Sequence, residues 1–308
     1  MHNRLRIIFF CNIMIRVKKM NDEKEMPMLQ WYPGHMKKAR DLIESNLKLV
    51  DIVIDVLDAR IPFSSQNPLL KEILTDKPRL IALCKSDLAD QKSTSEWIKH
   101  FKEEGAEAIA VDAVKGTGIK NLISAAKTLA EYQTHKLTKH GAKPRSARAM
   151  IVGIPNVGKS SLINRLAGSN HTKIENRPGV TRAKQWIKID NGLELLDTPG
   201  ILYPKFEDAQ VALKLSWTYA ISDEIHDLEP VVCLLLETLR TNYANDLINR
   251  FKLTEPVPTD GHELLELIGK KRGCIRKGGL IDTDKAQRMI LTEFRSGKLG
   301  RVTLDDLY

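Results

Sequence analysis

The segment GIPNVGKSS at residues 153–161 constrains the fold of this chain more than any other feature. Gly153, Gly158, Lys159 and Ser160 match the pattern G-x-x-x-x-G-K-[ST], a loop whose backbone N–H groups surround the phosphates of a nucleotide. Apolar residues before the loop and a helical pattern after it predict a strand–loop–helix unit, in which the helix N-terminus attracts the phosphates. Nearly half of the chain precedes this loop, whereas in an ordinary nucleotide-binding domain the loop follows the first strand.

The residues of this loop have distinct expected tasks. Lys159 is expected to reach the β- and γ-phosphates and to take part in catalysis, and Ser160 is expected to ligate Mg²⁺. The other residues expected to contact the nucleotide here are Asn156, Val157, Gly158 and Ser161.

The alternation of strand and helix patterns predicts an α/β domain, which a purely helical one follows. Apolar runs separated by helical periodicity are typical of a mostly parallel sheet with helices on both faces. The expected strands lie within residues 51–60, 79–87, 107–113, 149–152, 183–189 and 193–200. The expected division is an N-terminal extension outside the fold at 1–27, a nucleotide-binding domain at 28–203 with a basic linker at about 134–149, and an all-helical domain at 204–308.

The tetrapeptide CKSD at residues 84–87 indicates which base is bound. It follows the second expected strand, and ligands of open α/β sheets bind at the carboxyl ends of strands. In GTP-binding proteins N-K-x-D occupies such a position, and its Asp accepts hydrogen bonds from N1–H and the 2-amino group of guanine. Asp87 has this role here, and the stem of Lys85 can lie along the base, with Ser86 beside it. Cys84 replaces the usual Asn, which predicts weaker guanine binding but preserved specificity.

Three further motifs complete the expected site. The loop VDAVKG follows the third strand, and the backbone N–H of Ala113 or of its neighbour Asp112 is expected to approach guanine O6. DTPG resembles the D-x-x-G of GTPases, in which Asp197 lies behind the Mg²⁺ shell and the N–H of Gly200 meets the γ-phosphate. Thr181, within RPGVTR, is expected to close on Mg²⁺ as a switch residue.

The order of these motifs is rotated, because the base-reading pair precedes the three motifs that bind phosphate and metal. This order predicts a circularly permuted P-loop GTPase domain, in which the residues upstream of the phosphate loop are the second half of the sheet. A domain tolerates such a permutation when its original termini lie close together at the surface.

The chain resembles the circularly permuted GTPases of the YlqF type, ribosome biogenesis GTPase A, over residues 30–308. The resemblance rests on QWYPGHMKKAR, DARIPFSSQNP, GIPNVGKSSLINRLA, RPGVTR, LLDTPGILYPKFED and KRGCIRKGGLID. It implies a GTPase that binds pre-ribosomal RNA, promotes a late step in assembly of the large (50S) ribosomal subunit, and hydrolyses GTP faster on the particle. It also implies a helical RNA-binding domain, with GTP or GDP and Mg²⁺ as ligands.

The resemblance further implies how hydrolysis is promoted. Ile201 stands where many GTPases carry a water-orienting glutamine, and its side chain cannot take that role. His35 is the implied substitute, orienting water when the ribosome orders its segment; a surface or helix-capping histidine is the alternative. In related GTPases an Asn at the position of Asn156 helps to hold K⁺ beside the phosphates, whereas an amide that stabilises its own loop is the alternative.

An excess of basic residues points to an acidic partner. The net charge of +9 favours nucleic acid, although a lysine-rich proteome gives the same composition. The segment GKKRGCIRKGG at 269–279 contains no acidic residue and can follow an RNA phosphate backbone, a solvated helix end being the alternative. The cations expected to contact RNA are Lys270, Lys271, Arg272, Arg276 and Lys277.

The remaining features concern compartment and partners. Four cysteines at no metal-ligand spacing indicate reduced thiols of a cytoplasmic protein. The apolar run within residues 1–27 is too short to span a bilayer, so no membrane is expected. The expected explanation of these residues is a disordered extension or a start codon assigned too early, with Met28 as the true start, and a transit peptide to an organelle is the alternative. The expected molecule is a monomer whose partners are the large ribosomal subunit and its precursor rRNA. Two rivals are an RNA-binding assembly protein with GTP as a structural ligand, and a GTPase that acts on another RNA or in an organelle.

Overall fold

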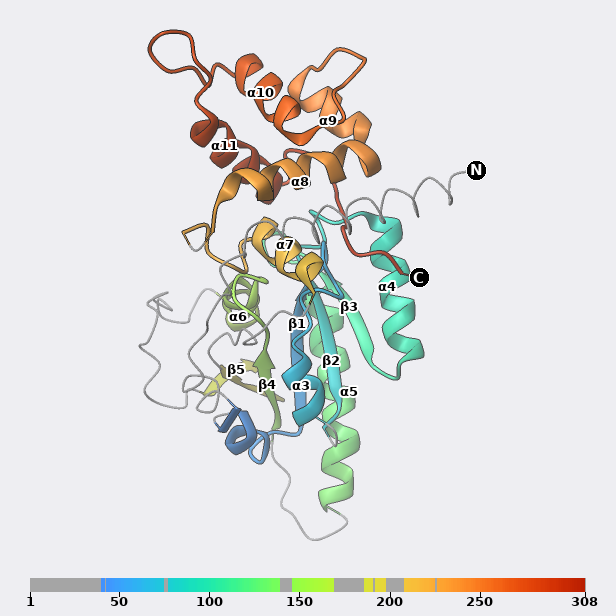
Figure 1. Cartoon of the computed structure of the whole chain (residues 1–308). Helices are drawn as coiled ribbons and strands as arrows, with labels where there is room; N and C mark the ends of the chain where they lie inside the picture. The colour runs from blue at the N-terminus through green and yellow to red at the C-terminus, as the bar shows by residue number, and fades with distance from the viewer. Residues whose placement is uncertain are drawn as a thin grey trace.

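A mostly parallel sheet forms the centre of the molecule (Figure 1). The structure is a computed structural model that describes residues 40–41, 43–74, 77–138, 146–168, 186–190, 192–197, 208–224 and 226–307. Within them the strands are β1 Ile52–Asp58, β2 Arg79–Cys84, β3 Glu107–Val111, β4 Ala147–Val152, β5 Trp186–Asp190 and β6 Leu193–Asp197. The six-stranded sheet has the order β3-β2-β1-β4-β6-β5, and β5 alone runs antiparallel to its neighbour. The predicted sheet is confirmed.

Helices cover both faces of this sheet, because alternate residues of β1 point to opposite sides. Ile54 packs in the apolar cluster that contains α5 and α6, whereas Leu57 packs with Trp97 of α4 and Val53 packs with Leu70 of α3. The helices of this part are α3 Pro68–Ile73, α4 Gln91–Glu103, α5 Ile119–Thr138 and α6 Lys159–Ala167. The prediction of a sheet covered on two sides is therefore confirmed.

A helical region follows the sheet, as predicted, and stands at the edge where the parallel strands end (Figure 1). In the described residues its helices are α7 Ala209–Trp217, α8 Leu228–Asn242, α9 Ala244–Phe251, α10 Gly261–Lys271 and α11 Thr283–Arg295. α8 is its centre and packs against α7, α9, α10 and α11, with Val232, Leu235 and Leu236 fully buried. None of the helices in the described ranges is both long and apolar enough to cross a membrane.

Two sequence-based expectations about this fold differ from the structure. The basic linker expected at about 134–149 overlaps regular structure at both ends, because α5 continues to Thr138 and β4 begins at Ala147. The helix α4 was not expected, since its first six residues, QKSTSE, are all polar. It forms because the Asp90 carboxylate caps it, accepting a hydrogen bond from the backbone N–H of Ser93 at 2.8 Å, and because Trp97 and Phe101 bury its inner face.

The C-terminal residues 302–305 return from the helical region to the sheet. The backbone N–H of Val302 donates to the carbonyl of Leu88 at 2.9 Å, and that of Leu304 donates to the carbonyl of Arg60 at 2.8 Å. Leu88 follows the CKSD segment and Arg60 follows β1, so this tail contacts both loops near the ends of their strands. Sequence periodicity gave no sign of this contact, because an extended tail has no helical pattern.

Asp305 is the buried charge that fixes the tail. Its carboxylate accepts hydrogen bonds from the backbone N–H and the hydroxyl of Ser64 at 2.8 and 2.7 Å, and it pairs with the ammonium of Lys214 in α7 at 2.8 Å. The backbone carbonyl of Asp305 also accepts from the indole N–H of Trp97 at 3.3 Å. One residue therefore ties the tail to the sheet domain and to the first helix of the helical region.

We expect Asp305→Ala to lower the free energy of unfolding by about 3 kcal/mol, because removing one partner of a buried ion pair leaves the other charge uncompensated. Urea unfolding followed by circular dichroism measures the loss. Asp306→Ala, at the exposed neighbouring position, is the matched control and should change the stability by less than about 0.5 kcal/mol. Equal effects of the two substitutions would contradict the assignment.

Candidate nucleotide-binding site

The P-loop leaves β4 at the centre of the sheet and turns directly into α6. Two of its glycines have backbone conformations that suit glycine, with φ of 156° at Gly153 and 107° at Gly158. A Cβ at Gly153 would lie 2.7 Å from the carbonyl oxygen of Val56, and one at Gly158 would lie 3.2 Å from the Cβ of Cys84. The glycines therefore let the loop lie close to the ends of β1 and β2.

The first turn of α6 contains Lys159, Ser160 and Ser161, and Val157 is buried beneath the loop. The N-terminus of this helix carries backbone N–H groups that have no partner within the helix and the positive end of the helix dipole, so it suits an anion. The hydroxyl of Ser160 belongs to the same turn and fits a Mg²⁺ ion held beside the phosphates.

Several expected site residues lie outside the described residues. These are His35, Thr181, Gly200 and the neighbouring Ile201, together with the side chain of Asp197. The main chain of Asp197 ends β6 and pairs with Ile151 in β4, so this residue leaves the sheet beside the P-loop strand. The proposed roles of these residues in metal binding and hydrolysis stay predictions.

The CKSD segment turns at the end of β2 in a conformation that positions Asp87. Lys85 has a left-handed backbone with φ of 57°, and its carbonyl accepts a hydrogen bond from the N–H of Leu88 at 2.9 Å. The N–H of Ser86 donates to the carbonyl of Val111 at the end of β3, at 3.2 Å. Asp87 is half-buried at the tip of this turn, where its carboxylate suits the two N–H donors of guanine.

The second base-reading loop, residues 112–117, is shaped by its own aspartate. The buried Asp112 carboxylate accepts hydrogen bonds from the N–H groups of Val114 and Lys115, both at 2.9 Å. Arg165 of α6 donates to the carbonyl of Lys115 at 2.7 Å, which ties the P-loop helix to this loop. The Asp112 side chain therefore stabilises the conformation of its own loop. Contact of the Ala113 N–H with guanine stays a prediction.

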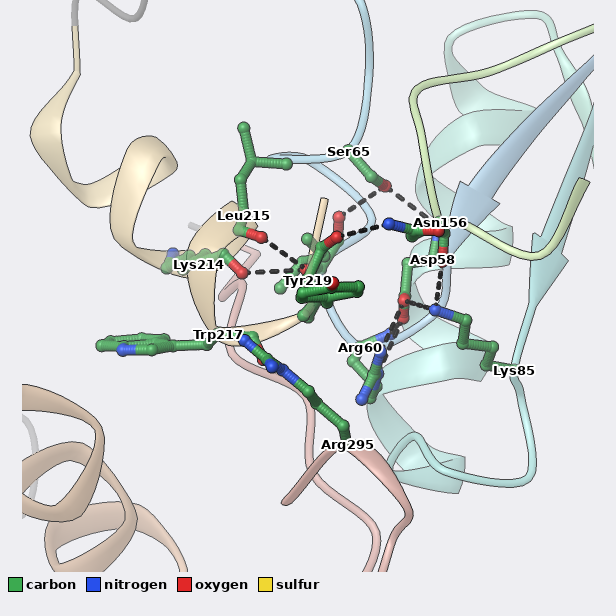
Figure 2. A network of polar contacts seen from close by, with 12 residues as sticks. Asp58, Arg60, Ser65, Lys85, Asn156, Lys214, Leu215, Trp217, Tyr219 and Arg295 are labelled. Carbon is green, nitrogen blue, oxygen red and sulfur yellow. Dashed lines mark hydrogen bonds and ion pairs between the residues drawn. The ribbon is translucent and has the colours of Figure 1, made fainter. Parts of the chain in front are cut away.

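The phosphate loop and the base-reading loop meet at Lys85, although they lie far apart in the sequence (Figure 2). The ammonium of Lys85 donates to the carbonyl of Asn156 in the P-loop at 2.5 Å and to the carboxylate of Asp58 at 2.9 Å. Sequence reasoning missed Asp58. The signal was a carboxylate placed at the carboxyl end of a buried strand, in the DAR of DARIPFSSQNP.

Asp58 is a buried carboxylate held between two cations. Its side chain is 2% exposed, and Arg60 binds both oxygens, with Nε 2.9 Å from Oδ1 and Nη2 2.7 Å from Oδ2. Burial alone would raise the pKa of Asp58, but the charges of Arg60 and Lys85 outweigh it and hold that pKa well below the usual range of an aspartate. Asp58 is therefore ionised at neutral pH.

Cys84 occupies the position at which the N-K-x-D pattern has asparagine, and it lies against the P-loop at Gly158. It is 1% exposed, and burial, with a smaller contribution from the charge of Asp58, raises the pKa of its thiol to about 12. The side chain is therefore an uncharged apolar group that packs under the loop, and it has no amide with which to hold the base.

Asn156 connects the P-loop to the helical region. Its side-chain amide donates to the backbone carbonyl of Tyr219 at 2.7 Å (Figure 2). Asn156 itself has a left-handed backbone with φ of 60°. The amide thus stabilises an arrangement between the loop and the helical region, and coordination of K⁺ by Asn156 stays a prediction.

The five cations expected to contact RNA differ in their surroundings. Arg272 pairs with Glu293 at 2.6 Å, and Arg276 pairs with Asp282 at 3.2 Å and with Asp284 at 2.8 Å. The ammonium of Lys271 donates to the backbone carbonyl of Lys252. Lys270 and Lys277 are exposed. Asp284 and Glu293 of α11, with Asp282 just before this helix, therefore neutralise part of the predicted basic patch.

A P-loop and a predicted guanine-reading loop meet at one edge of a mostly parallel sheet, which is the arrangement of a P-loop GTPase. Residues 148–255 match the family described as "50S ribosome-binding GTPase". Ribosome biogenesis GTPase A of Bacillus cereus is 50% identical over 278 residues, which cover 90% of this chain and 94% of that protein.

More distant relatives agree with this assignment. Mitochondrial ribosome-associated GTPase 1 of Bos taurus is 34% identical and covers 90% of this chain and 88% of its own length. The crystal structure of GNP-bound YlqF from T. maritima superposes with a TM-score of 0.61 at 30% identity, covering 86% of this chain and 97% of that one. The chain belongs to the ribosome biogenesis GTPase A family, and the predicted resemblance, fold class and GTPase activity are confirmed.

The raised pKa of Cys84 predicts that its thiol resists alkylation in the folded protein. Because the folded pKa of about 12 lies above the ordinary value of about 8.5, the neutral thiol contributes stability that is lost as pH rises between these values. We expect iodoacetamide at pH 8.5 to label Cys84 at least ~100-fold more slowly in the folded protein than in urea. Peptide mass spectrometry measures both rates, and equal rates would contradict the burial of this thiol.

Proposed function

We propose that this GTPase binds the maturing large (50S) ribosomal subunit, promotes a late step of its assembly, and leaves the particle after GTP hydrolysis. The observation that carries the nucleotide part is the contact of Lys85 with Asn156, which joins a base-reading loop to a phosphate loop. The ribosomal part is supported by the relatives, whose names describe ribosome biogenesis and ribosome association.

We infer that the GTPase domain is circularly permuted. In support, the P-loop follows β4, the fourth strand of the chain, while the two base-reading loops follow β2 and β3. β4 lies between β1 and β6 in the sheet. The rotated order of the motifs therefore changes how the strands are connected along the chain, but it keeps the P-loop and the base-reading loops at the same edge of the sheet. The break between β6 and β1 and the segment that joins α5 to β4 are then the places where the connectivity differs.

Mg²⁺ is the proposed metal cofactor, held by Ser160 and Thr181 with Asp197 behind them. When bound, it neutralises charge on the γ-phosphate. Lys159 binds the β- and γ-phosphates and positions them, and the N–H groups at the start of α6 hold the same charge. His35 is the proposed group that orients the attacking water, and K⁺ at Asn156 is a second contribution.

Ribosomal RNA is the proposed partner of the basic segment in the helical region. Lys270 and Lys277, which are exposed, are its best candidates for phosphate contacts, with Lys271 next to them. Arg272 and Arg276 can contribute only by sharing or exchanging their acidic partners. We further propose a monomer in the cytoplasm; action on another RNA or in an organelle, or GTP as a structural ligand, are the competing functions.

Asp87→Asn tests the assignment of the base. An amide in place of the carboxylate cannot accept both guanine donors, and its NH₂ matches the 2-oxo group of xanthine. We expect GDP affinity to fall by at least roughly 100-fold and xanthosine diphosphate affinity to rise, measured by isothermal titration calorimetry. Glu96→Gln, on the exposed face of α4, is the control and should bind GDP normally. Unchanged GDP affinity in Asp87→Asn would place the base elsewhere.

GTP hydrolysis with and without purified large ribosomal subunits tests the ribosomal function. We expect the particle to stimulate turnover at least ~10-fold, more strongly in KCl than in NaCl, and His35→Ala to abolish the stimulation. Stimulation that survives in His35→Ala would move catalysis to another group, with K⁺ at Asn156 next. Absence of any stimulation would favour the competing function in which GTP is a structural ligand.

A further inference from the structure

We propose that Asp58 is a positioning residue for guanine-nucleotide binding, which holds Lys85 against the P-loop. The proposal rests on the proposed nucleotide site. It adds to that site a residue that belongs to none of the nucleotide-binding motifs, because Asp58 lies at the end of β1, upstream of all of them.

The contacts of Lys85 show what Asp58 does. The ammonium reaches Oδ2 of Asp58 at 2.9 Å and the carbonyl of Asn156 at 2.5 Å, so the lysine stem spans from the base-reading loop to the P-loop (Figure 2). The lysine side chain is 25% exposed, whereas the aspartate is 2% exposed. A partly exposed lysine has many rotamers, and a buried ionised partner restricts it to the one in which its stem can lie along the base.

Asp58 is itself held rigidly, as a positioning residue must be. Its Oδ1 accepts from the backbone N–H of Arg60 at 3.1 Å and from the guanidinium of Arg60 at 2.9 Å. The backbone N–H of Asp58 donates to the hydroxyl of Ser65 at 3.1 Å, and that hydroxyl donates to the carbonyl of Ile61 at 2.7 Å. The carboxylate orientation is fixed before Lys85 binds to it.

The charge of Asp58 matters as much as its shape. Two cations, Arg60 and Lys85, approach the same oxygen at 2.7 and 2.9 Å. Replacement of the carboxylate by a neutral amide leaves these cations facing each other in a buried place, and their repulsion drives the more mobile Lys85 away. Asp58→Asn should therefore release Lys85 from the carbonyl of Asn156.

Asp55 provides a matched control on the same strand. It is 1% exposed and binds Arg79 through Oδ2, with Nε at 2.9 Å and Nη2 at 2.6 Å. Arg79 begins β2, at the opposite end of that strand from Lys85. Asp55→Asn therefore breaks another buried aspartate–arginine pair of β1 without touching the junction of the two loops.

The experiment measures the affinity and dissociation rate of a fluorescent GDP analogue with the full-length protein. We expect Asp58→Asn to weaken binding roughly tenfold, mainly through faster dissociation, and Asp55→Asn to change it less than about twofold. A double-mutant cycle adds Lys85→Met. If Asp58 acts through Lys85, the double variant Asp58→Asn/Lys85→Met binds no more weakly than Lys85→Met alone. Additive losses, or equal losses in the Asp55 and Asp58 variants, would overturn the proposal.

Two further variants keep the test decisive. If Asp58→Asn does not fold, the double variant Asp58→Asn/Arg60→Met removes both buried charges together, so that no guanidinium is left unpaired. It should still weaken GDP binding, because Lys85 loses its anionic partner, but by less than Asp58→Asn, because the repulsion from Arg60 is gone. Lys159→Ala tests the site independently. If Lys159→Ala abolishes GDP binding and the Asp58 variants bind normally, the positioning role is wrong; if Lys159→Ala binds normally, the proposed nucleotide site is wrong.

Discussion

The position of β1 between β2 and β4 is the constraint on which the nucleotide site depends. All three strands are parallel, so their carboxyl ends meet at one edge of the sheet and the loops that follow them become neighbours. The register sets Asp58 opposite Cys84 and Asp55 opposite Val152, which places the ends of β1 and β2 level with each other and β4 beside them. A one-residue shift in the strand pairing would move every side chain of the shifted strand to the opposite face of the sheet. The separate apolar clusters on the two faces exclude such a shift.

The helical region contacts the P-loop through the turn that follows α7. That helix ends with the pair of hydrogen bonds of a Schellman motif, from the N–H of Ala220 to the carbonyl of Leu215 at 2.8 Å and from the N–H of Tyr219 to that of Ser216 at 3.0 Å. Tyr219 occupies the left-handed position, φ 67°, where glycine is usual, and its ring lies beneath the guanidinium of Arg295 at 4.7 Å (Figure 2). This turn points the carbonyl of Tyr219 at Asn156, so the P-loop is in contact with the region proposed to bind RNA.

The sequence allowed prediction of most of the fold and the motifs of the site, because both depend on local patterns. Buried parallel strands are continuous apolar runs, and the P-loop and CKSD segments have fixed spacing. What could not be predicted depends on contacts between distant residues. The capping of α4 by Asp90 compensates for a polar first turn, the binding of Asp305 to Ser64 and Lys214 returns the tail to the sheet, and Asp58 meets Lys85 only once the strands pair.

In the basic segment at 269–279, too, contacts between distant residues change what the sequence predicts. Five cations without an intervening acid predict a wide phosphate footprint, with each contact steepening the salt dependence of binding by roughly 0.7–0.9 log units. In the fold, Glu293 and Asp284 of α11 neutralise two of them, so the footprint is narrower. Glu293 precedes Phe294, whose ring lies 5.5 Å from the guanidinium of Arg60, the partner of Asp58. Neighbouring residues of α11 therefore contact Arg272 of the basic segment and Arg60, the partner of Asp58, so that this helix connects the segment proposed to bind RNA with the junction at Lys85.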